Sequence, residues 1–522
     1  MKTKKILGIA LAVCMTIGLT TVPAMAEDKK TFVFGDTTFN AENEEADINP
    51  QNTYAGWACI RYGVGETLFR YSDTMEIEPW IAKEYENVDE LTWKITLNDG
   101  VVFSNGRACD GQAVKESLES LVENHERAAG DLCIDSIEAD GNVVTIKTTE
   151  PKPALINYLS DPYGCIIDVQ AGITDNGIVI GTGPYVATDL VTDDHLTLVK
   201  NENYWNGDVN VDEITVRTIS DGDTLAFALQ AGEINAAYGM AYASYPLFEN
   251  DDFTFSSAAT SRAFYAWMNF ESTVTSDPAV RKAIAMGIDK ESFVSVLLNG
   301  YGYPAVGAFP DTFSFGGQNL TTESYDPDGA KKVLEDAGWK DTDGDGYRDK
   351  DGVKASFMAV YPSGDSMRQA VGMSTAEQAK KLGIEIIVKG ESWDDIIADM
   401  FSNAVIMGWG SSNPYVSYSL FHSSGKLKTD YYNPENYDNP TVDKHLENAV
   451  TALTVEDSYK EFQLAQWDGT TGTAMKADCP WVWLVNAHHL YFVKDGLEIG
   501  DQHHAHGATW PLVENLKEWK WN

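Results

Sequence analysis

The sequence predicts a mixed α/β fold, built from two or three domains whose chain segments interleave. The chain has 522 residues, whereas a single domain typically has about 100–200. Segments with helix-start signals occur together with segments of period-two alternation. No internal repeat and no low-complexity linker divides the chain, which favours lobes that share segments over domains in tandem.

The expected strands show alternating apolar and polar residues. Alternation indicates a strand because successive side chains point to opposite faces of a sheet. The pattern occurs at Thr92–Leu97, Val143–Lys147, His195–Val199 and Ile214–Thr218. We therefore expect a strand at each of these four positions.

The expected helices begin at aspartate residues. An Asp at the N-cap with a Pro in the first helical position predicts a helix start, and this pair occurs at Asp277-Pro278 and Asp326-Pro327. Asp289 begins a further helix, which we expect to end at Asn299-Gly300 because Gly commonly follows the last turn.

The first 26 residues are expected to be a signal peptide rather than part of the fold. Three lysines precede an apolar run over 6–22, and Ala24 and Ala26 supply the small side chains that signal peptidase requires. Cleavage before Cys14, as in a lipoprotein, is the alternative, but it would leave an apolar tail on the mature protein. We therefore expect an extracytoplasmic protein, in the periplasm or at the cell surface, after cleavage near Ala26.

The chain is strongly acidic, with 38 lysine and arginine residues against 79 aspartate and glutamate residues and a formal net charge of −41. Binding to nucleic acid requires a basic surface. The composition therefore excludes a nucleic-acid partner, and it does not identify a ligand.

Five cysteines follow the expected signal peptide, at Cys59, Cys109, Cys133, Cys165 and Cys479. They are odd in number and show no CxxC spacing, so at most two disulfides could form. A chain of this length does not need disulfides for stability. We expect buried free thiols.

Nine segments, in the same order, resemble segments of the family 5 solute-binding proteins, the nickel, dipeptide and oligopeptide receptors of ABC importers. Each segment alone is weak evidence, and it is their number and order over nearly the whole chain that carry the resemblance. The segments are Gly65–Tyr71, Glu78–Ala82, Leu91–Ile95, Val101–Gly106, Gly181–Tyr185, Lys200–Trp205, Leu229–Ile234, Val280–Lys290 and Tyr325–Trp339.

The resemblance implies a clamshell of two α/β lobes joined by two crossing strands, the type II, cluster C architecture of periplasmic binding proteins. Lobe I would comprise residues 27–272 and 488–522, with an extra subdomain at about 73–180, and lobe II residues 273–487. Members of the family bind a small molecule or peptide by hinge closure and deliver it to the permease subunits of an ABC transporter in the membrane. We expect a monomer that has no catalytic activity and requires no cofactor.

The resemblance places a Trp-centred loop of lobe II in the cleft, with Trp409, Asn413 and Tyr415 as expected ligand contacts. Peptide receptors of the family usually carry an acidic residue just after this Trp, which pairs with the α-amino group of the peptide. Ser411 and Ser412 stand there instead, and a buried ammonium without a counter-charge is costly. A chelate of nickel or another metal is therefore favoured, with a dipeptide, an oligopeptide or a peptide signal as the alternative ligand.

Further ligand contacts are expected from lobe I and the hinge. Tyr54, Trp57 and Arg61 occupy a segment that faces the cleft in relatives, and Arg262 lies on the strand that enters the hinge. A guanidinium binds a carboxylate through two parallel hydrogen bonds. The match with nickel receptors is partial, because a tryptophan and an arginine expected in lobe I are missing.

Histidines supply candidate metal ligands. His504 and His506 point to the same side of an extended segment, the spacing with which two imidazoles share a metal ion. His422 follows the Trp409 loop, so a histidine from each lobe would make metal binding and closure the same event. The alternative is that these are surface or hydrogen-bonded histidines.

A second candidate metal site resembles a calcium loop. Asp341, Asp343, Asp345 and Asp349 occupy its positions 1, 3, 5 and 9, with a glycine at position 6. Position 12, which holds a bidentate glutamate in such loops, is a glycine here. The alternative to a structural calcium site is an ordinary surface turn.

A secreted hydrolase is the alternative from another functional class, because acidic, aromatic-rich exported chains are often glycosidases. The sequence contains no GxSxG and no HExxH motif. A receptor without catalytic activity is therefore the favoured interpretation.

Overall fold

The computed structural model describes residues 30–41, 46–72, 76–310, 313–316, 324–400, 402–411, 413–425, 433–500 and 516–522. The expected signal peptide, including Cys14, lies outside these residues, as do His504 and His506. Among the helices of the described ranges, none is both long and apolar enough to cross a lipid bilayer.

A seven-stranded sheet forms the core of the first lobe, in the order β12-β21-β11-β1-β10-β9-β8. The central strand β1 runs parallel to β10 and β11, and the other neighbours are antiparallel. The strands are β1 (Thr31–Asp36), β8 (Tyr185–Val191), β9 (His195–Lys200), β10 (Glu213–Thr218), β11 (Ala236–Tyr238), β12 (Phe253–Ala258) and β21 (His489–Lys494).

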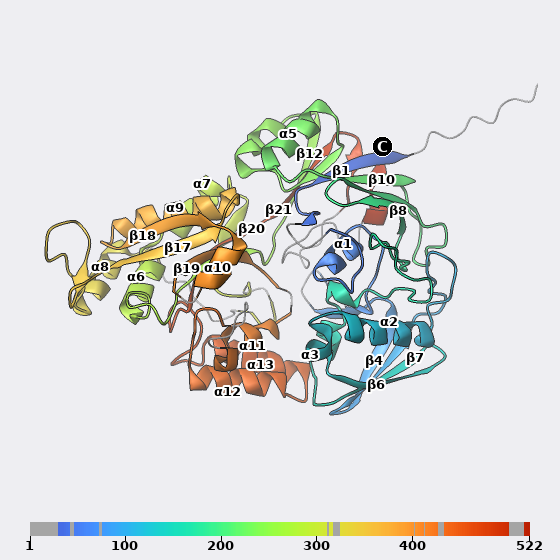
Figure 1. The fold of residues 1–522 in the computed structure, drawn as a ribbon, viewed down its shortest axis with the longest axis horizontal. Helices are drawn as coiled ribbons and strands as arrows, with labels where there is room; N and C mark the ends of the chain where they lie inside the picture. Colours follow the sequence, from blue (N-terminus) through green and yellow to red (C-terminus); the bar gives the residue numbers. More distant parts are fainter. Residues whose placement is uncertain are drawn as a thin grey trace, which may run out of the picture.

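A six-stranded sheet forms the core of the second lobe, in the order β14-β20-β13-β19-β17-β18. Its central strands are apolar and buried at almost every position, because helices cover both faces of the sheet (Figure 1). The strands are β13 (Ala263–Trp267), β14 (Gly302–Pro304), β17 (Ser356–Pro362), β18 (Glu385–Glu391), β19 (Ala404–Trp409) and β20 (Trp481–Ala487).

Three helices of the second lobe begin where the sequence predicts. Asp277, Asp289 and Asp326 each accept a hydrogen bond from a backbone N–H of the first turn, which confirms them as N-caps. The helices are α6 (Pro278–Gly287), α7 (Lys290–Leu297), α8 (Pro327–Asp336), α9 (Ser366–Lys380), α10 (Trp393–Asp399), α11 (Val416–Phe421), α12 (Pro440–Val450) and α13 (Val455–Gln466).

A four-stranded antiparallel sheet in the order β4-β5-β7-β6 forms a separate layer of the first lobe. It falls within the segment 73–180 that we expect to be an extra subdomain. The four strands predicted from alternation are confirmed here and in the seven-stranded sheet. The elements are β4 (Ala82–Asp89), β5 (Thr92–Leu97), β6 (Ile134–Asp140), β7 (Val143–Thr148), α2 (Gly111–Asn124) and α3 (Ala128–Leu132).

Short elements complete both lobes and connect the layers. In the first lobe, they include α1, which lies beside the seven-stranded sheet (Figure 1), and α4, which follows β7 in the chain. These elements are α1 (Ala55–Arg61), α4 (Leu155–Tyr158), α5 (Gly222–Ala231), η2 (Pro162–Gly164), η3 (Tyr242–Phe248), η4 (Ser423–Gly425), η5 (Leu516–Glu518), β2 (Phe69–Tyr71), β3 (Ile77–Pro79), β15 (Asp349–Lys350), β16 (Val353–Lys354), β22 (Leu497–Glu498) and β23 (Lys520–Trp521).

Within the described ranges, the chain passes between the two large sheets twice. The first passage runs from Ala258 to Ala263 and the second from Ala487 to His489. The first therefore comes earlier than the boundary of 272–273 given by the resemblance, because β13 pairs with β19 and β20 of the second sheet. The paired β22 and β23 follow the second passage.

The two lobes also touch at a second place, away from the passages (Figure 1). Asn157 of α4 donates a 3.3 Å hydrogen bond from Nδ2 to the hydroxyl of Tyr459 in α13. The ring of Tyr158 lies 6.1 Å from the ring of Tyr415. The first lobe therefore reaches the second through the end of its extra sheet layer.

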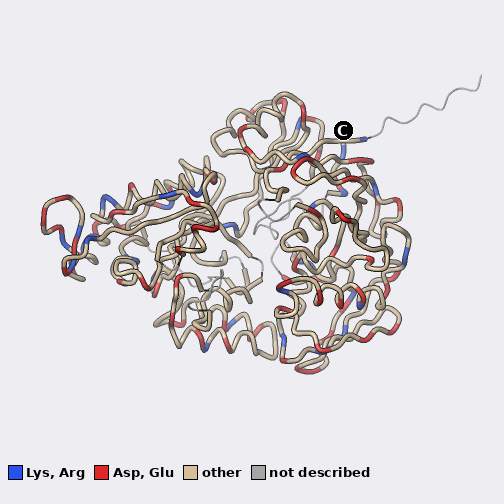
Figure 2. Tube along the Cα trace, viewed as in Figure 1, with Lys and Arg blue, Asp and Glu red and all other residues tan. Residues whose placement is uncertain are grey.

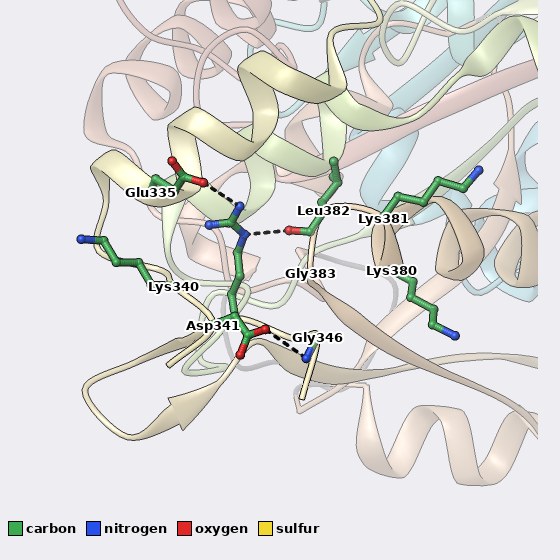
Figure 3. Close-up of a pocket in the computed structure, with 9 residues that line it drawn as sticks. Glu335, Lys340, Asp341, Gly346, Lys380, Lys381, Leu382 and Gly383 are labelled. Atoms are coloured by element: carbon green, nitrogen blue, oxygen red, sulfur yellow. Dashed lines mark hydrogen bonds and ion pairs between the residues drawn. The ribbon is translucent and has the colours of Figure 1, made fainter. Parts of the chain in front are cut away.

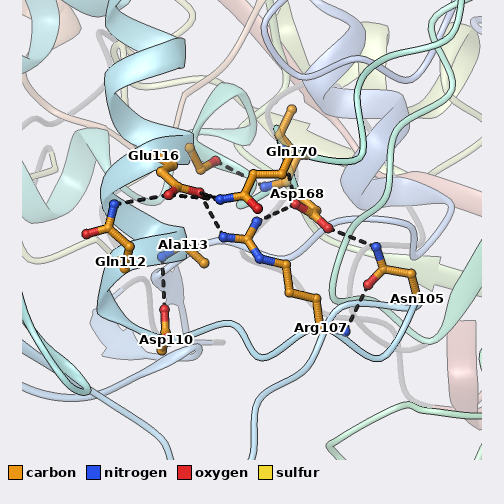
Figure 4. A network of polar contacts seen from close by, with 10 residues as sticks. Asn105, Arg107, Asp110, Gln112, Ala113, Glu116, Asp168 and Gln170 are labelled. Atoms are coloured by element: carbon orange, nitrogen blue, oxygen red, sulfur yellow. Dashed lines mark hydrogen bonds and ion pairs between the residues drawn. The ribbon is translucent and has the colours of Figure 1, made fainter.

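A polar network joins that sheet layer to the rest of the first lobe (Figure 4). The guanidinium of Arg107 donates to Glu116 of α2 at 2.8 Å and also contacts the carboxylate of Asp168. Gln170 donates to Glu116 at 3.0 Å, and Asn105 donates to Asp168 at 2.8 Å. One arginine therefore holds helix α2 and the 168–170 segment together.

Candidate ligand-binding site

Two arginine side chains converge on Gly408, at the end of β19 and directly before Trp409. Arg368, in the first turn of α9, donates from Nη2 to the Gly408 carbonyl at 3.4 Å. Arg262 lies in the first passage between the lobes, and a Cβ at Gly408 would lie 3.1 Å from its Nη2. The absence of a side chain at Gly408 thus gives both guanidinium groups access to the same place.

The two arginines differ in their charge partners. Arg368 donates to the carboxylate of Asp365 at 2.9 Å. Arg262 is half-buried, and no side-chain hydrogen bond or ion pair joins its guanidinium to any residue of the described part of the chain. Removal from water lowers the pKa of Arg262, and the neighbouring Arg368 lowers it further. A cation in these surroundings is stabilised when an anion binds to it.

Trp409 forms part of an aromatic cluster beside these arginines. Its indole lies 5.9 Å from the ring of Phe309 and 6.4 Å from the ring of Trp481, in both cases edge to face. Trp409 pairs across the sheet with Ala263, the residue after Arg262. The side chain is half-buried, so the cluster fixes its orientation and leaves part of its surface free.

Arg61, a predicted ligand contact, is occupied within the first lobe. Its guanidinium is fully buried and donates to Asp36 at 3.0 Å and to the hydroxyl of Thr38 at 2.8 Å. The hydroxyl of Tyr62 donates to the same carboxylate at 2.7 Å. Arg61 therefore anchors α1 to β1 through a buried ion pair, and its contact with a ligand stays a prediction.

His489 lies at the start of β21, directly after the second passage between the lobes. The hydroxyl of Tyr238 lies 2.9 Å from its Nδ1, and its Nε2 has no hydrogen-bond partner within the described ranges. Burial lowers the pKa of His489 to about 3, and the positive charges of Arg262 and Arg61 contribute to this shift. The imidazole is therefore neutral at physiological pH.

The other predicted aromatic and polar contacts have structural partners. Asn413 accepts a 3.0 Å hydrogen bond from the backbone N–H of Tyr415, and the buried hydroxyl of Tyr415 accepts one from Ser458 at 2.9 Å. Tyr54 is exposed and lies under the guanidinium of Arg127 at 5.7 Å. Trp57, on α1, is half-buried.

His422 is engaged within the second lobe. Its ring stacks on Tyr418 at 4.3 Å, its Nδ1 lies 2.8 Å from the hydroxyl of Ser424, and its Nε2 lies 3.6 Å from Glu447. These contacts turn both ring nitrogens toward its own lobe. A metal site shared with His504 and His506 stays a prediction, because those two residues lie outside the described ranges.

The predicted calcium loop brings together three of its four aspartates. Carboxylate oxygens of Asp341, Asp343 and Asp345 lie within 4.8 Å of one another, and all three side chains are exposed. The carboxylate of Asp349 instead accepts hydrogen bonds from the hydroxyl and the N–H of Thr342. Asp349 is therefore not part of the cluster, and calcium binding by the remaining three stays a prediction.

A cavity of about 460 Å³ lies beside this loop, on the second lobe (Figure 3). Its wall mixes charges of both signs, and the guanidinium of Arg348 donates to Glu335 at 3.1 Å and to the carbonyl of Leu382 at 2.8 Å. The remaining lining residues are Lys340, Asp341, Gly346, Lys380, Lys381 and Gly383. The cavity shares none of its lining residues with the arginine pair at Gly408.

Three residues of this region were not among the ligand contacts predicted from the sequence, namely Arg368, Tyr238 and His489. No local pattern distinguishes Arg368, whose role depends on where α9 packs. His489 had a usable signal, because it directly follows the expected return to the first lobe, where the cleft begins.

Comparison with known proteins identifies the family of this chain. The sequence model of the bacterial extracellular solute-binding proteins, family 5 (middle part), matches residues 76–430. Protein XP55 of Streptomyces lividans is 31% identical over 437 residues, which cover 81% of this chain and 78% of that protein. The oligopeptide-binding protein AppA of Bacillus subtilis (strain 168) is 30% identical over 420 residues, which cover 76% of this chain and 77% of AppA.

A solved structure shares the fold over nearly its full length. NikZ from Campylobacter jejuni, in complex with Ni(L-His), gives a TM-score of 0.77 at 23% sequence identity, and the match covers 94% of this chain and 99% of that chain. The two-lobe α/β architecture expected from the resemblance is thereby confirmed. The chain belongs to family 5 of the bacterial extracellular solute-binding proteins, the solute-binding components of ABC importers.

Proposed function

We propose that this protein captures a small solute bearing a carboxylate in the cleft between its lobes and delivers it to an ABC permease. The observation that carries the proposal is the pair Arg262 and Arg368 at Gly408, of which Arg262 has no anionic partner among the described residues. A carboxylate bound there would receive charge-assisted hydrogen bonds in a partly dehydrated place, where they are strong.

Ligand binding at this position favours closure of the two lobes. Arg262 lies within one passage between the lobes, His489 directly follows the other, and Arg368 belongs to the second lobe. A solute that contacts groups on both sides of the passages binds the closed form more tightly than the open form. That difference in affinity is what drives a hinge equilibrium toward closure.

The charges around the site favour a metal chelate of an amino acid over a free peptide. The nearby carboxylates already have partners, since Asp36 pairs with Arg61 and Asp365 pairs with Arg368. The α-amino group of a peptide would find no free anion among them, whereas the carboxylates of a chelator would find two guanidinium groups. Nickel held by such a chelator could also accept the free Nε2 of neutral His489 as a ligand.

A peptide is the second candidate ligand, favoured by the 30% identity to an oligopeptide-binding protein. In both cases we propose an exported monomer that is cleaved near Ala26 and has no catalytic activity. The acidic side chains spread over both lobes support function as a soluble receptor rather than binding to an anionic surface (Figure 2).

The first experiment is native mass spectrometry of the protein purified from its own host, which weighs any co-purified solute. Isothermal titration calorimetry with nickel, with and without L-histidine, and with short peptides then distinguishes the two ligand classes. Tightening by nickel only when histidine is present would support the chelate. Binding of peptides irrespective of metal would support the alternative ligand.

Arginine variants test the site itself. Arg262→Ala and Arg368→Ala should each weaken binding of the identified ligand by about tenfold or more, because each loses a charge-assisted hydrogen bond worth about 1.5–3 kcal/mol. Arg217→Ala is the matched control, since Arg217 lies on β10 and pairs only loosely, at 3.8 Å, with Glu233. Equal affinity in all three variants and the wild type would refute the site. Turnover of a substrate, instead of a shift in melting temperature, would favour the hydrolase.

A further inference from the structure

Cys59 and Cys165 lie side by side in the core of the first lobe. Both are buried, at 0% and 3% exposure. A Cβ at Gly65 would lie 2.7 Å from the sulfur of Cys59 and 3.1 Å from the sulfur of Cys165, so both sulfurs border the same point. Burial raises the pKa of the Cys165 thiol, and the neighbouring Cys59 thiol raises it further. Two sulfurs beside the same glycine are therefore candidates for a disulfide.

The backbone around the two thiols is held in place from both sides. A Cβ at Gly56, one helical turn before Cys59, would lie only 2.6 Å from the carbonyl oxygen of Pro162, so α1 packs directly on η2. The N–H of Gly65 donates to the carbonyl of Cys59 at 3.1 Å. Close backbone packing of this kind keeps two cysteines within bridging distance, which is the main geometric requirement for a disulfide.

The remaining described thiols contact other groups. The sulfur of Cys133 lies 3.0 Å from the carbonyl of Gly130, and the sulfur of Cys479 lies 3.6 Å from the carbonyl of Trp481. Cys109 is buried, and the nearest charges that act on it are those of Glu66 and Asp110. The pair Cys59–Cys165 is therefore distinguished by a thiol–thiol contact.

We propose that Cys59 and Cys165 form a disulfide in the exported protein, an inference that rests on the export included in the proposed function. In the reaction the two thiols give up two protons and two electrons to a disulfide-bearing oxidant of the extracytoplasmic space, which is released as two thiols. Because both sulfurs are buried in the folded protein and out of reach of an external oxidant, the exchange takes place before α1 packs on η2.

The bond would link the two ends of the extra sheet layer. Cys59 precedes β4 and Cys165 follows β7 and α4, so the covalent loop would contain the whole four-stranded sheet. The same loop carries Asn157 and Tyr158, which contact the second lobe. A disulfide at its base would restrict the unfolded chain and hold this contact arm against α1.

Peptide mapping of the protein from the exported fraction of its host tests the proposal. Cells are lysed in iodoacetamide without reductant, and the protein is digested and analysed by mass spectrometry before and after reduction. We expect a linked pair of peptides that contain Cys59 and Cys165 and separate on reduction. Exported protein with both residues alkylated would overturn the disulfide alone. Failure to find the chain outside the cytoplasm would overturn export and the disulfide together.

Variants add a second readout. Cys165→Ser should leave Cys59 alkylated, whereas the control Cys109→Ser should leave the linked peptides unchanged. Double substitution of Cys59 and Cys165 by Ser should lower the melting temperature by on the order of 5 °C, as expected for loss of a large covalent loop. Linked peptides that instead join Cys59 to another cysteine would overturn the assignment, and peptide mapping decides this even if a variant folds poorly.

Discussion

The indole of Trp205 donates a 2.7 Å hydrogen bond to the carboxylate of Glu66. The same carboxylate accepts hydrogen bonds from the hydroxyl of Tyr204 at 2.8 Å and from that of Thr182 at 2.9 Å. Three of the segments that carry the family resemblance therefore meet at one fully buried glutamate. Burial raises the pKa of Glu66 to about 7, even though the three hydrogen bonds oppose the shift.

The raised pKa of Glu66 predicts how stability depends on pH. The folded state binds the proton more tightly than the unfolded chain, whose pKa is near the usual 4.5, so this group destabilises the fold as pH rises from 4.5 to 7. The unfolding free energy of the wild type, measured relative to that of Glu66→Gln, should therefore fall by about 3 kcal/mol as pH rises from 4.5 to 7. Urea unfolding at several pH values measures it.

Two variants complete that test. Glu84→Gln, on the exposed face of β4, should show no comparable pH-dependent difference from wild type. Glu66→Ala leaves one buried and two half-buried donors without their acceptor and should cost about 3 kcal/mol or more. A pH-independent difference between wild type and Glu66→Gln would contradict a protonated Glu66.

His489 should give the opposite dependence of stability on pH. Its pKa is lowered from 6.5 to about 3 by burial and by nearby positive charges, so it stabilises the fold above pH 6.5 and this contribution is lost as pH falls. Relative to His489→Asn, the wild type should lose about 2 kcal/mol between pH 6.5 and pH 5. His195→Asn is the contrasting variant, because hydrogen bonds that its imidazole donates to the carboxylates of Asp194 and Asp189 raise the pKa of His195. The two variants should therefore deviate from wild type in opposite directions.

The contact between the lobes at Tyr459 should favour the closed form. Tyr459→Phe removes the acceptor for the 3.3 Å hydrogen bond from Asn157, which retains only its 3.0 Å bond to Tyr71. Loss of about 1 kcal/mol from the closed form alone should weaken ligand binding about fivefold. Calorimetry with the identified ligand measures the change, and small-angle scattering should show more open molecules. Tyr325→Phe, at a tyrosine that is 53% exposed, should leave affinity and scattering unchanged.

A side chain at position 408 should weaken ligand binding without disrupting the fold. A Cβ there would lie 2.9 Å from the ring of Phe264 and 3.1 Å from Nη2 of Arg262, so Gly408→Ala displaces the guanidinium from its position. We expect at least tenfold weaker binding with circular dichroism unchanged. Gly130→Ala is the control, because nothing lies within 4 Å of a Cβ at that position. Normal affinity in Gly408→Ala would mean that the ligand does not depend on Arg262.

Local signals in the sequence determined most of the secondary structure. A cap such as Asp277 acts on N–H groups within its own first turn, and the alternation in Thr92–Leu97 follows from the geometry of one strand. Such signals need only a few neighbouring residues, so they can be identified without the fold. The nine segments, by their number and order, indicated the family, and the resemblance to the family predicted the two lobes.

Which of the candidate residues lie close together depended on long-range packing. Arg61 and Arg262 were equivalent in the sequence, but packing buried one against Asp36 and left the other beside Gly408. The packing of α9 also placed Arg368 at Gly408, and the turn at Thr342 drew Asp349 away from the other aspartates. These outcomes depend on contacts between residues far apart in the chain, and no local pattern encodes which partner a charged side chain finds when the sheets and helices close around it.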